Sequence, residues 1–327
     1  MTLPPTAIIV PGSVLASDVK AVHDNASWTS AVPHISVVIP TFRHDASWLM
    51  EGLSRCASPA SAIEVIVYDD GSRDDNVRDR HHAAADRSKT PMRVVTSTCN
   101  KGRAGARNSG VSYARANWIL LMDADMAPDS PGFVGTYLAA IAGVARPALI
   151  VGGYSLNQAP SDQRFDLHRW QARTSECIPA SARCRAPGRH VFSSNVLAHR
   201  DVLADCPFDE NFAGWGWEDT DWGLRAQASY PIIHIDNTAT HLGLDPSTEL
   251  MAKYARSGGN FGLLAARHPR AVAKMPLHRA ARFAKGLPCR ALLTSIARQI
   301  ASSDRAPVAI RGRALKAWRA LVYADAL

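Results

Sequence analysis

The sequence predicts an α/β fold with a mixed, mostly parallel sheet flanked by helices and a basic helical C-terminal extension. Short apolar runs alternate with helical patterns from residue 33 onward, as in chains that build a parallel sheet. These runs are nearly continuous, which is typical of strands buried on both faces. Polar residues directly follow three of them, at the sheet edge where such folds bind ligands.

Composition and charge divide the chain into unequal parts. Of the 327 residues, 46% are hydrophobic and 20% are charged, which allows a sizeable core and excludes global disorder. The formal charge of +8 is uneven, because residues 267–327 carry 13 Lys and Arg against two Asp, a net of +11, and the remainder carries −3. We predict an N-terminal arm (1–32), a main domain (33–243) and a basic helical extension (244–327).

The elements of the main domain follow from periodicity and from turn residues. Strands are expected at residues 35–39, 63–68, 92–95, 118–122, 148–151 and 230–235, and helices at 46–57, 74–87, 102–116 and near 200. The weak signals in 1–32 are interpreted as an arm or an extra edge strand. The polar, Arg-rich stretch 158–189 has no clear period, and long loops of this kind are often functional.

Several features bear on the cellular compartment. The uncharged stretch 130–145 is too short to span a membrane, and the first 17 residues have three prolines and no Lys or Arg, unlike a secretory signal. Six scattered cysteines without CxxC spacing favour a reducing compartment. We therefore expect a cytoplasmic protein, with peripheral attachment to the inner face of the cell membrane as an option for the basic tail.

Aspartates follow two of the predicted strands. Asp123 and Asp125 are spaced to reach a divalent cation and the diphosphate that it bridges, and their hard oxygens suit Mn²⁺ or Mg²⁺. Asp69 and Asp70 fit either an Asp/Gly turn or a contact to a base or ribose. His241, which follows a late strand, is either a structural histidine or a further metal ligand.

The segment Asn100–Gly110 opens a helix and is rich in glycine and cations. A helix start favours a phosphate, and Lys101, Arg103 and Arg107 could neutralise one. The segment lacks the Gly-Lys-Ser/Thr ending of a Walker loop and is not a dinucleotide fingerprint, which would directly follow the first strand. The alternative is a capped surface helix.

The most specific segment is Gly214–Asp221. Trp215 and Trp217 alternate with glycines directly before Glu218 and Asp219, which predicts an aromatic wall for a sugar beside a carboxylate that acts as a general base. The alternative is that the acids complement the helix dipole and the tryptophans are core residues. That alternative explains the acids but leaves the Trp-Gly-Trp pattern unexplained.

In this order and spacing, the motifs resemble the family 2 glycosyltransferases, which have the GT-A fold. The resemblance covers roughly residues 33–243, about two thirds of the chain. The similar segments are Ile35–Phe42, Val67–Ser72, Asn100–Gly110, Leu121–Asp125 and Phe208–Arg225. The last of these looks most like the C-terminal half of the β-1,4-galactosyltransferase-like enzymes. Trp217 stands where many relatives carry a second glycine, which makes the acceptor side bulkier.

The resemblance implies an inverting, metal-dependent hexosyltransferase. It would move a sugar from a nucleotide-sugar donor, UDP-linked, to an acceptor hydroxyl on a glycan or lipid-linked glycan. It also implies that Asp219 is the general base with Glu218 beside it, and that Asp125 and His241 hold the metal. The donor-binding positions that it implies are Pro40, Thr41, Asp69, Asp70, Lys101, Arg107 and Asp123, and Trp215 would line the sugar.

Two functions from other classes stay open. One is a surface-binding protein with a degenerate catalytic domain, although the intact Asp125, Asp219 and His241 argue against degeneracy. The other is a sugar nucleotidyltransferase, which should carry a Gly-rich, basic loop after the first strand; this chain has none there.

The basic tail contains two apolar helical stripes with arginines among them. One stripe consists of Leu292, Leu293, Ile296 and Ile300, and the other of Leu315, Trp318 and Val322. Such helices either lie on an anionic membrane surface or pack on the domain with a solvated basic face. Nucleic acid is not an expected partner, because no nucleic-acid motif accompanies the charge.

Overall fold

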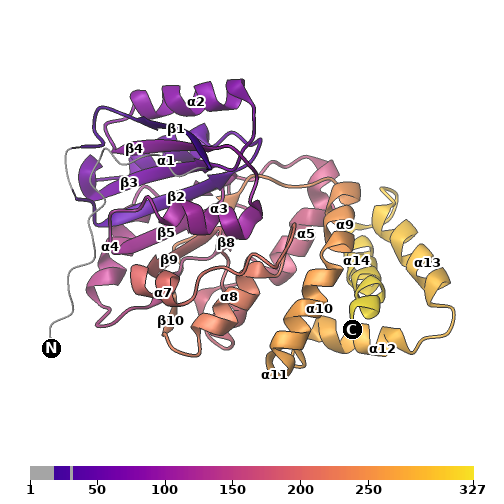
Figure 1. Ribbon diagram of the computed structural model, residues 1–327. Coiled ribbons are helices and arrows are strands. Elements are labelled where there is room, and N and C mark those ends of the chain that lie inside the picture. Colours follow the sequence, from indigo (N-terminus) through magenta and orange to yellow (C-terminus); the bar gives the residue numbers. More distant parts are fainter. Residues whose placement is uncertain (1–17, 30–31) are drawn as a thin grey trace.

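The computed structural model describes residues 18–29 and 32–327, so most of the predicted arm lies outside the described residues. Its centre is an eight-stranded sheet with the strand order β1-β4-β3-β2-β5-β9-β7-β10 (Figure 1). The strands are β1 (Val19–Asp24), β2 (Ile35–Thr41), β3 (Ile63–Asp69), β4 (Met92–Ser97), β5 (Trp118–Met122), β7 (Leu149–Val151), β9 (Asn195–His199) and β10 (Ile232–His234).

The sheet is mixed, with a parallel centre. Strand β2 pairs in parallel with β3 and β5, β3 with β4, and β7 with β10. Antiparallel pairs add β1 to the edge at β4 and place β9 between β5 and β7. The predicted extra edge strand therefore exists as β1. The parallel strands bring the carboxyl ends of β2, β3, β4 and β5 to one edge of the sheet, where ligand sites form in such folds.

Helices cover both faces of the sheet (Figure 1). One core cluster joins the strands to α1 (Ser47–Cys56), α2 (Asp75–Asp86) and α4 (Phe133–Ala142). A second joins the opposite face to α3 (Gly102–Val111), α7 (Arg200–Asp205) and α8 (Glu218–Ala226). Burial on both faces explains why these strands are apolar without alternation. The predicted α/β fold class is confirmed.

A small sheet and several short helices complete the domain. Strands β6 (Met126–Pro128), β11 (Ala239–His241) and β8 (Tyr154–Ser155) form the small sheet, which places His241 beside the end of β5. The stretch 158–189, which has no period in the sequence, contains the helix α5 (Asp166–Ser175). Further short helices are η1 (Ala60–Ala62), η2 (Gln163–Phe165), α6 (Ala180–Arg183), η3 (Pro187–His190) and η4 (Ala324–Ala326).

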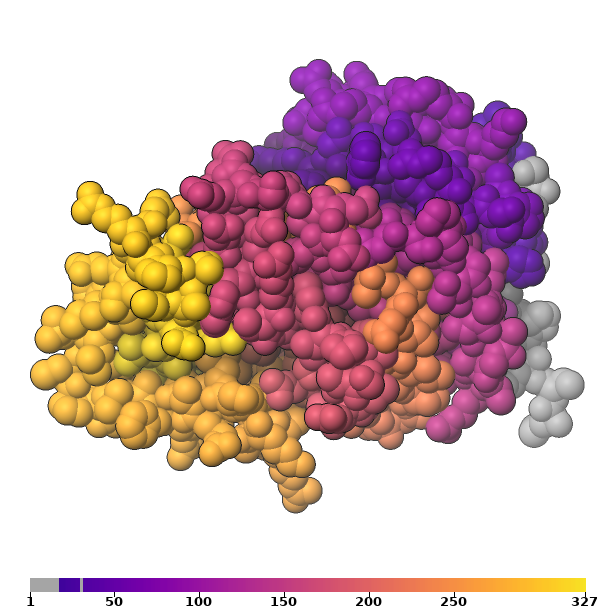
Figure 2. All heavy atoms as spheres, turned by 180° about the vertical axis from the view of Figure 1, so that it is seen from behind, coloured from indigo at the N-terminus to yellow at the C-terminus, as the bar shows by residue number. Residues whose placement is uncertain are grey.

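The tail is helical, as predicted, and part of it belongs to the core. Its helices are α9 (Ser247–Arg256), α10 (Gly258–Arg267), α11 (Pro269–Val272), α12 (Pro276–Lys285), α13 (Arg290–Ser302) and α14 (Val308–Tyr323). Helix α14 packs closely against α5. The backbone at Gly312 lies so near the ring of Trp170 that an added Cβ would collide with it. Figure 2 shows the last residues, in yellow, against the segment near residue 170.

The two predicted apolar stripes of the tail have different environments. Leu315 and Trp318 of α14 are buried, with exposed fractions of 1% and 5%. On α13, the described helix buries only Ala297 and Ala301, whereas Leu292, Leu293, Ile296 and Ile300 are exposed. Of the two stripes, only the one on α13 therefore lies on the surface. No helix of the described part is long and apolar enough to cross a bilayer.

Candidate active site

Three predicted donor-binding residues meet at the ends of β2 and β3. The backbone N–H of Asp70 donates to the carbonyl of Thr41 at 2.8 Å, and the Asp70 carboxylate accepts from the N–H groups of Lys101 (2.9 Å) and Gly102 (3.0 Å). The Asp70 side chain thus caps the start of α3 and holds the Gly-rich segment against the sheet. Burial raises the pKa of Asp70. The two hydrogen bonds from Lys101 and Gly102 lower this pKa, but burial has the larger effect.

The side chains of Lys101 and Asp69 have other partners. The ammonium of Lys101 pairs with Asp18, which precedes β1, and donates to the hydroxyl of Ser109 at 3.0 Å. The Asp69 carboxylate accepts from both the N–H and the hydroxyl of Ser72, which closes the turn after β3. Pro40 lies beside Tyr68 in the β2–β3 register and is partly exposed.

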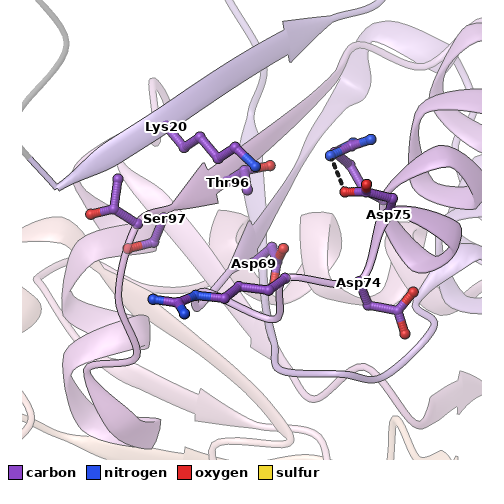
Figure 3. Close-up of a pocket in the computed structure, with 9 residues that line it drawn as sticks. Lys20, Asp69, Asp74, Asp75, Thr96 and Ser97 are labelled. Atoms are coloured by element: carbon purple, nitrogen blue, oxygen red, sulfur yellow. Dashed lines mark hydrogen bonds and ion pairs between the residues drawn. The ribbon is translucent and has the colours of Figure 1, made fainter.

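A cavity of about 400 Å³ opens beside Asp69, at the carboxyl ends of β3 and β4 (Figure 3). Lys20 of β1 reaches over it from one side, and Asp74 and Asp75 lie on the other, at the start of α2. Its wall mixes both signs of charge with hydroxyl groups, including that of Thr96. No signal in the sequence pointed to Lys20, since the first 32 residues carry no motif.

Arg107 is the central cation of a second group. It is 1% exposed, donates to Asp123 at the end of β5 (2.7 Å) and lies 3.5 Å from Glu218 at the start of α8. Arg103, one turn away, lies 3.7 Å from the same Glu218 oxygen. The buried guanidinium of Arg107 therefore joins two predicted acids, Asp123 and Glu218, that come from separate motifs. Removal of the Arg107 cation would take away the charge that pairs with these two acids.

Asp219 follows Glu218 at the start of α8 and is held by Ser193. The backbone N–H and the hydroxyl of Ser193 donate to its carboxylate at 3.1 and 2.7 Å. Burial and the neighbouring Glu218 charge raise the pKa of Asp219 to about 6, although Arg107 and the Ser193 hydrogen bond lower it. A carboxylate with a pKa near 6 can accept a proton at neutral pH more readily than an ordinary aspartate.

The Gly-Trp-Gly-Trp pattern forms a tight turn into α8. Gly214, Gly216 and Trp217 have φ values of 77°, 93° and 79°, so two of the three are glycines where the left-handed region requires them. Trp217 adopts the same region with a large side chain, at a strain of about 1–2 kcal/mol. Its ring packs on Phe261, whereas Trp215 lies edge-on to Tyr254 of α9.

Asp125 and His241 face each other across the small sheet. The His241 Nε2 and the Asp125 Oδ2 are 3.1 Å apart. Burial alone would raise the pKa of Asp125, but the charge and hydrogen bond of His241 outweigh it and hold that pKa below its usual range. A Cβ at Gly243 would collide with the Asp125 carboxylate, so the glycine two residues after His241 is required for this pairing.

These two side chains fit a divalent cation that completes its coordination with substrate. The described residues contain no group of three His, Cys, Asp or Glu placed to hold a metal. One or two carboxylates are the usual protein contribution for Mg²⁺, which keeps waters and phosphate oxygens as further ligands, and His241 would add a nitrogen beside the Asp125 carboxylate. The buried Nδ1 of His241 has no hydrogen-bond partner among the described residues, which leaves a second ring nitrogen for a ligand.

The second group of residues surrounds one cavity of about 200 Å³. Of the predicted residues, it is lined by Asp123, Asp125, Trp215, Glu218, Asp219 and His241. Sequence reasoning missed several others that line it, from the aperiodic stretch and the tail: His168, Glu176, Asp245, Lys253, Tyr254 and Arg319. For His168 and Glu176, the one signal in the sequence was that the stretch 158–189 is long and has no period. Arg319 was indistinguishable from the other tail arginines.

The sequence of this region matches a described family. Residues 36–176 match the model of glycosyl transferase family 2. The chain carries a family 2 glycosyltransferase domain. The predicted family is therefore confirmed, and the glycosyltransferase domain holds β2 to α5 with the Asp70, Arg107 and Asp125 positions. The resemblance of residues 208–225 to the β-1,4-galactosyltransferase-like enzymes lies outside this match and stays a prediction.

Similar curated proteins are glycosyltransferases. Validoxylamine A glucosyltransferase of Streptomyces hygroscopicus subsp. limoneus is 31% identical over 229 residues, which are 61% of this chain and 49% of the relative. Human dolichyl-phosphate beta-glucosyltransferase is 32% identical over 112 residues, 32% of this chain and 35% of the relative. The chain thus spans about half the length, or less, of these relatives.

Solved structures share the fold. A mannosyltransferase from Pyrobaculum calidifontis in complex with GDP-Man and Mn²⁺ superimposes with a TM-score of 0.51 at 17% identity, over 92% of this chain and 88% of the other. Glucosyl-3-phosphoglycerate synthase from Mycobacterium tuberculosis in complex with Mg²⁺ and UDP gives a TM-score of 0.50 at 19% identity, over 74% and 81%. These similarities support the GT-A architecture of the glycosyltransferase domain.

Proposed function

We propose that the chain is a metal-dependent, inverting hexosyltransferase that moves a sugar from UDP to an acceptor hydroxyl. The observation that carries this proposal is the position of Asp219. Its carboxylate, with a pKa of about 6, lines the same small cavity as the Asp125–His241 pair. A proton acceptor and a cation-binding pair in one cavity are the two groups that displacement of a nucleoside diphosphate requires.

The donor would lie along the carboxyl edge of the sheet. The nucleoside part fits beside Thr41, Asp69 and Asp70, and the diphosphate extends toward Asp125 and His241. Since Lys101 pairs with Asp18 and Arg107 with Asp123, Arg103 is the guanidinium of α3 that lines the cavity. On that ground, we assign Arg103 the role of binding the diphosphate. Arg107 is assigned the role of holding Asp123 and Glu218 in position.

The reaction would be a single displacement. Asp219 takes the proton of the acceptor hydroxyl while the hydroxyl oxygen attacks the anomeric carbon of the donor sugar. The bond between that carbon and the departing diphosphate oxygen breaks on the opposite face. The configuration inverts and the protein forms no covalent intermediate. When bound, the cation supplies charge stabilisation for the leaving diphosphate. Ser193 holds the base in place, and Trp215 offers a ring to the sugar.

The other classes receive less support. A degenerate domain would not need to keep a strained Trp217 or a buried Asp123–Arg107–Glu218 group, both of which cost folding free energy. A sugar nucleotidyltransferase should have its phosphate loop after the first central strand. There Thr41 leads into Phe42 and Arg43 and the chain continues to α1 without a Gly-rich turn.

The acceptor side has a feature that favours a lipid-linked glycan at an anionic membrane. The exposed apolar residues of α13 share the surface with exposed cations of the tail helices, and the same helices reach the cavity through α14. Exposed Leu and Ile with surrounding arginines are complementary to an anionic lipid surface. We propose the exposed stripe of α13, defined as Leu292, Leu293, Ile296 and Ile300, as the membrane-facing surface.

A donor panel tests the proposed function. The purified chain is incubated with UDP-, GDP- and TDP-linked hexoses and Mn²⁺, and release of the nucleoside diphosphate is measured with and without excess EDTA. We expect release from a UDP-hexose that EDTA abolishes. Release of pyrophosphate instead would support the nucleotidyltransferase, and no binding of any nucleotide would support the degenerate domain.

A further inference from the structure

The C-terminal helix α14 places a guanidinium without an anionic partner in the catalytic cavity. Arg319 lines the cavity together with Asp219, Asp125 and His241. Within the described residues, no carboxylate lies within 4.0 Å of Arg319, and its buried Nε has no hydrogen-bond partner. Glu176 is a carboxylate that acts on it electrostatically, from beyond ion-pair distance.

Neutral aromatic rings surround this guanidinium. Its carbon Cζ lies 4.1 Å from the ring centroid of Tyr254 and 5.1 Å from those of Trp217 and Tyr323. Burial raises the pKa of Tyr254, so this phenol stays uncharged, and the Tyr323 hydroxyl bonds with Ser257. The rings fix the guanidinium plane by cation–π contacts but supply no negative charge.

The other cations of the cavity already have partners. Lys253 pairs with Asp245 at 2.7 Å, and Arg103 lies 3.7 Å from Glu218. Elsewhere in the tail, Arg311 is also buried but donates to the hydroxyl of Ser247 and lies 3.1 Å from Asp304. Arg319 differs from these cations because a partly buried charge without an anion costs free energy that a ligand could offset.

The place of Arg319 points to the acceptor rather than to the donor. It covers the ring of Trp217, which directly precedes Glu218 and Asp219 in the chain, and it comes from the tail, opposite the nucleoside side of the domain. None of the residues that cap α3 contacts it. An anion bound to Arg319 would therefore lie on the side of the cavity where the base acts.

We propose that Arg319 binds a phosphate ester of the acceptor and so positions the acceptor hydroxyl at Asp219. This inference rests on the proposed glycosyltransferase function and adds the chemical class of the acceptor. A planar guanidinium offers paired donors that match phosphate oxygens, which a lysine cannot reproduce. The strained Trp217, which occupies a glycine-like conformation, then has a role, since its ring supports the arginine.

The test uses a small phosphate ester as the probe. The full chain is saturated with UDP and Mn²⁺, and binding of glycerol 3-phosphate is measured by calorimetry, with glycerol and glycerate as neutral and carboxylate controls. We expect glycerol 3-phosphate to bind the native chain, and Arg319→Gln to weaken it ~10–100-fold, as for loss of a charged hydrogen bond. Arg313→Gln, an exposed position on the same helix, should leave it unchanged.

Each other outcome overturns a distinct statement. Equal binding of the probe by Arg319→Gln and the native chain, or no binding by the native chain, overturns the acceptor site. Tighter binding of glycerate than of glycerol 3-phosphate shows that the site does not select a phosphate ester.

If Arg319→Gln weakens the binding of UDP–Mn²⁺ instead of the binding of the probe, the anion at Arg319 is the donor diphosphate. If the native chain does not bind UDP, the proposed function fails, and probe binding without nucleotide still tests Arg319. Arg319→Lys keeps the charge if the glutamine variant unfolds.

Discussion

Ser193 donates two hydrogen bonds to the carboxylate of Asp219, one from its backbone N–H at 3.1 Å and one from its hydroxyl at 2.7 Å. The serine lies just before β9, and the aspartate lies at the start of α8, 26 residues later. Both hydrogen bonds favour the ionised carboxylate, whereas burial and Glu218 oppose ionisation. The balance leaves Asp219 with a pKa near 6, which is suited to accepting a proton near neutral pH.

Removal of the proposed base, Asp219, should slow turnover without weakening donor binding. We expect Asp219→Asn to lower kcat by ~10²–10⁴-fold, the usual range for general base catalysis, with UDP–Mn²⁺ affinity nearly unchanged. The folded protein holds the Asp219 pKa above its unfolded value, so ionisation destabilises the fold at neutral pH. The variant should therefore melt no lower than the native chain at pH 7.5. A collapse of donor binding would make Asp219 a donor ligand.

The pH dependence of turnover should report the same group. Since the base must be ionised, kcat/KM should fall as the pH drops through about 6. Ser193→Ala removes the hydroxyl that lowers the Asp219 pKa, so the acid limb should move to higher pH. Initial rates between pH 5 and 8 measure both profiles, and Ser295→Ala, exposed on α13, is the control. An unshifted limb in Ser193→Ala would argue against Asp219 as the titrating group.

Loss of the carboxylate that faces His241 should abolish metal-dependent nucleotide binding. We expect Asp125→Ala to lose turnover and the Mn²⁺-dependent part of UDP affinity while the fold survives, because one of the two proposed protein ligands is gone. Calorimetry of UDP with and without Mn²⁺ measures the effect. Asp79→Ala removes an exposed carboxylate on α2 and serves as the control. Full activity of Asp125→Ala, or of the native chain in excess EDTA, would refute the metal role.

A methyl group at Gly243 should disturb the same pair from the other side. The added Cβ would meet the Asp125 carboxylate, so Gly243→Ala should weaken Mn²⁺-dependent UDP binding, with the helical structure of the chain intact by circular dichroism. Gly135→Ala is the matched control, since a Cβ there meets nothing within 4 Å on the helix α4. The control should keep its UDP affinity and gain up to ~1 kcal/mol of stability. Equal binding by the two variants would contradict this arrangement.

The membrane-facing surface should bind anionic vesicles. We expect the native chain to sediment with vesicles of phosphatidylglycerol more than with phosphatidylcholine, and less at high salt, since each nearby Lys or Arg contributes ~1 kcal/mol. Leu292→Ser with Ile296→Ser should reduce this binding, whereas Trp48→Ser, an exposed aromatic on α1, should not. Unchanged binding by the double variant would leave the face without a lipid role, and concentration-dependent self-association would assign it to a second copy.

Truncation of the tail is not a clean test of membrane binding. Tyr323 and Trp318 are buried in the tail core with Phe261 and Tyr254, and Arg319 lines the cavity. Removal of residues beyond 266 would expose these rings and take Arg319 out of the cavity wall. Surface substitutions on α13 change the exposed face alone, because this helix buries only Ala297 and Ala301.

Local patterns in the sequence determined the layered part of the fold. Nearly continuous apolar runs such as Ile63–Asp69, interrupted by Glu64, are typical of strands in a sheet covered on both faces, and acids at the ends of parallel strands then share one edge. Gly214 and Gly216 adopt positive φ values that glycine allows, whereas nothing in the sequence indicated that Trp217 adopts one as well. The shared edge for Asp69, Asp70, Asp123 and Asp125 followed from this topology, whereas the place of Glu218 in the site was implied only by the family resemblance.

Only the tertiary structure decided which groups pair within the site and what the tail does. Ser193 finds Asp219, and Arg107 finds Asp123 and Glu218, through contacts between segments far apart in the chain, which carry no local period. The stripes on α13 and α14 look alike in sequence, since helical periodicity reports an apolar face but not whether a neighbour covers it. The stripe of α14 is buried in a cluster that α5, α9, α12 and α13 complete, whereas α13 turns only Ala297 and Ala301 toward that cluster. The same packing brings Arg319 to the cavity that Asp219 lines.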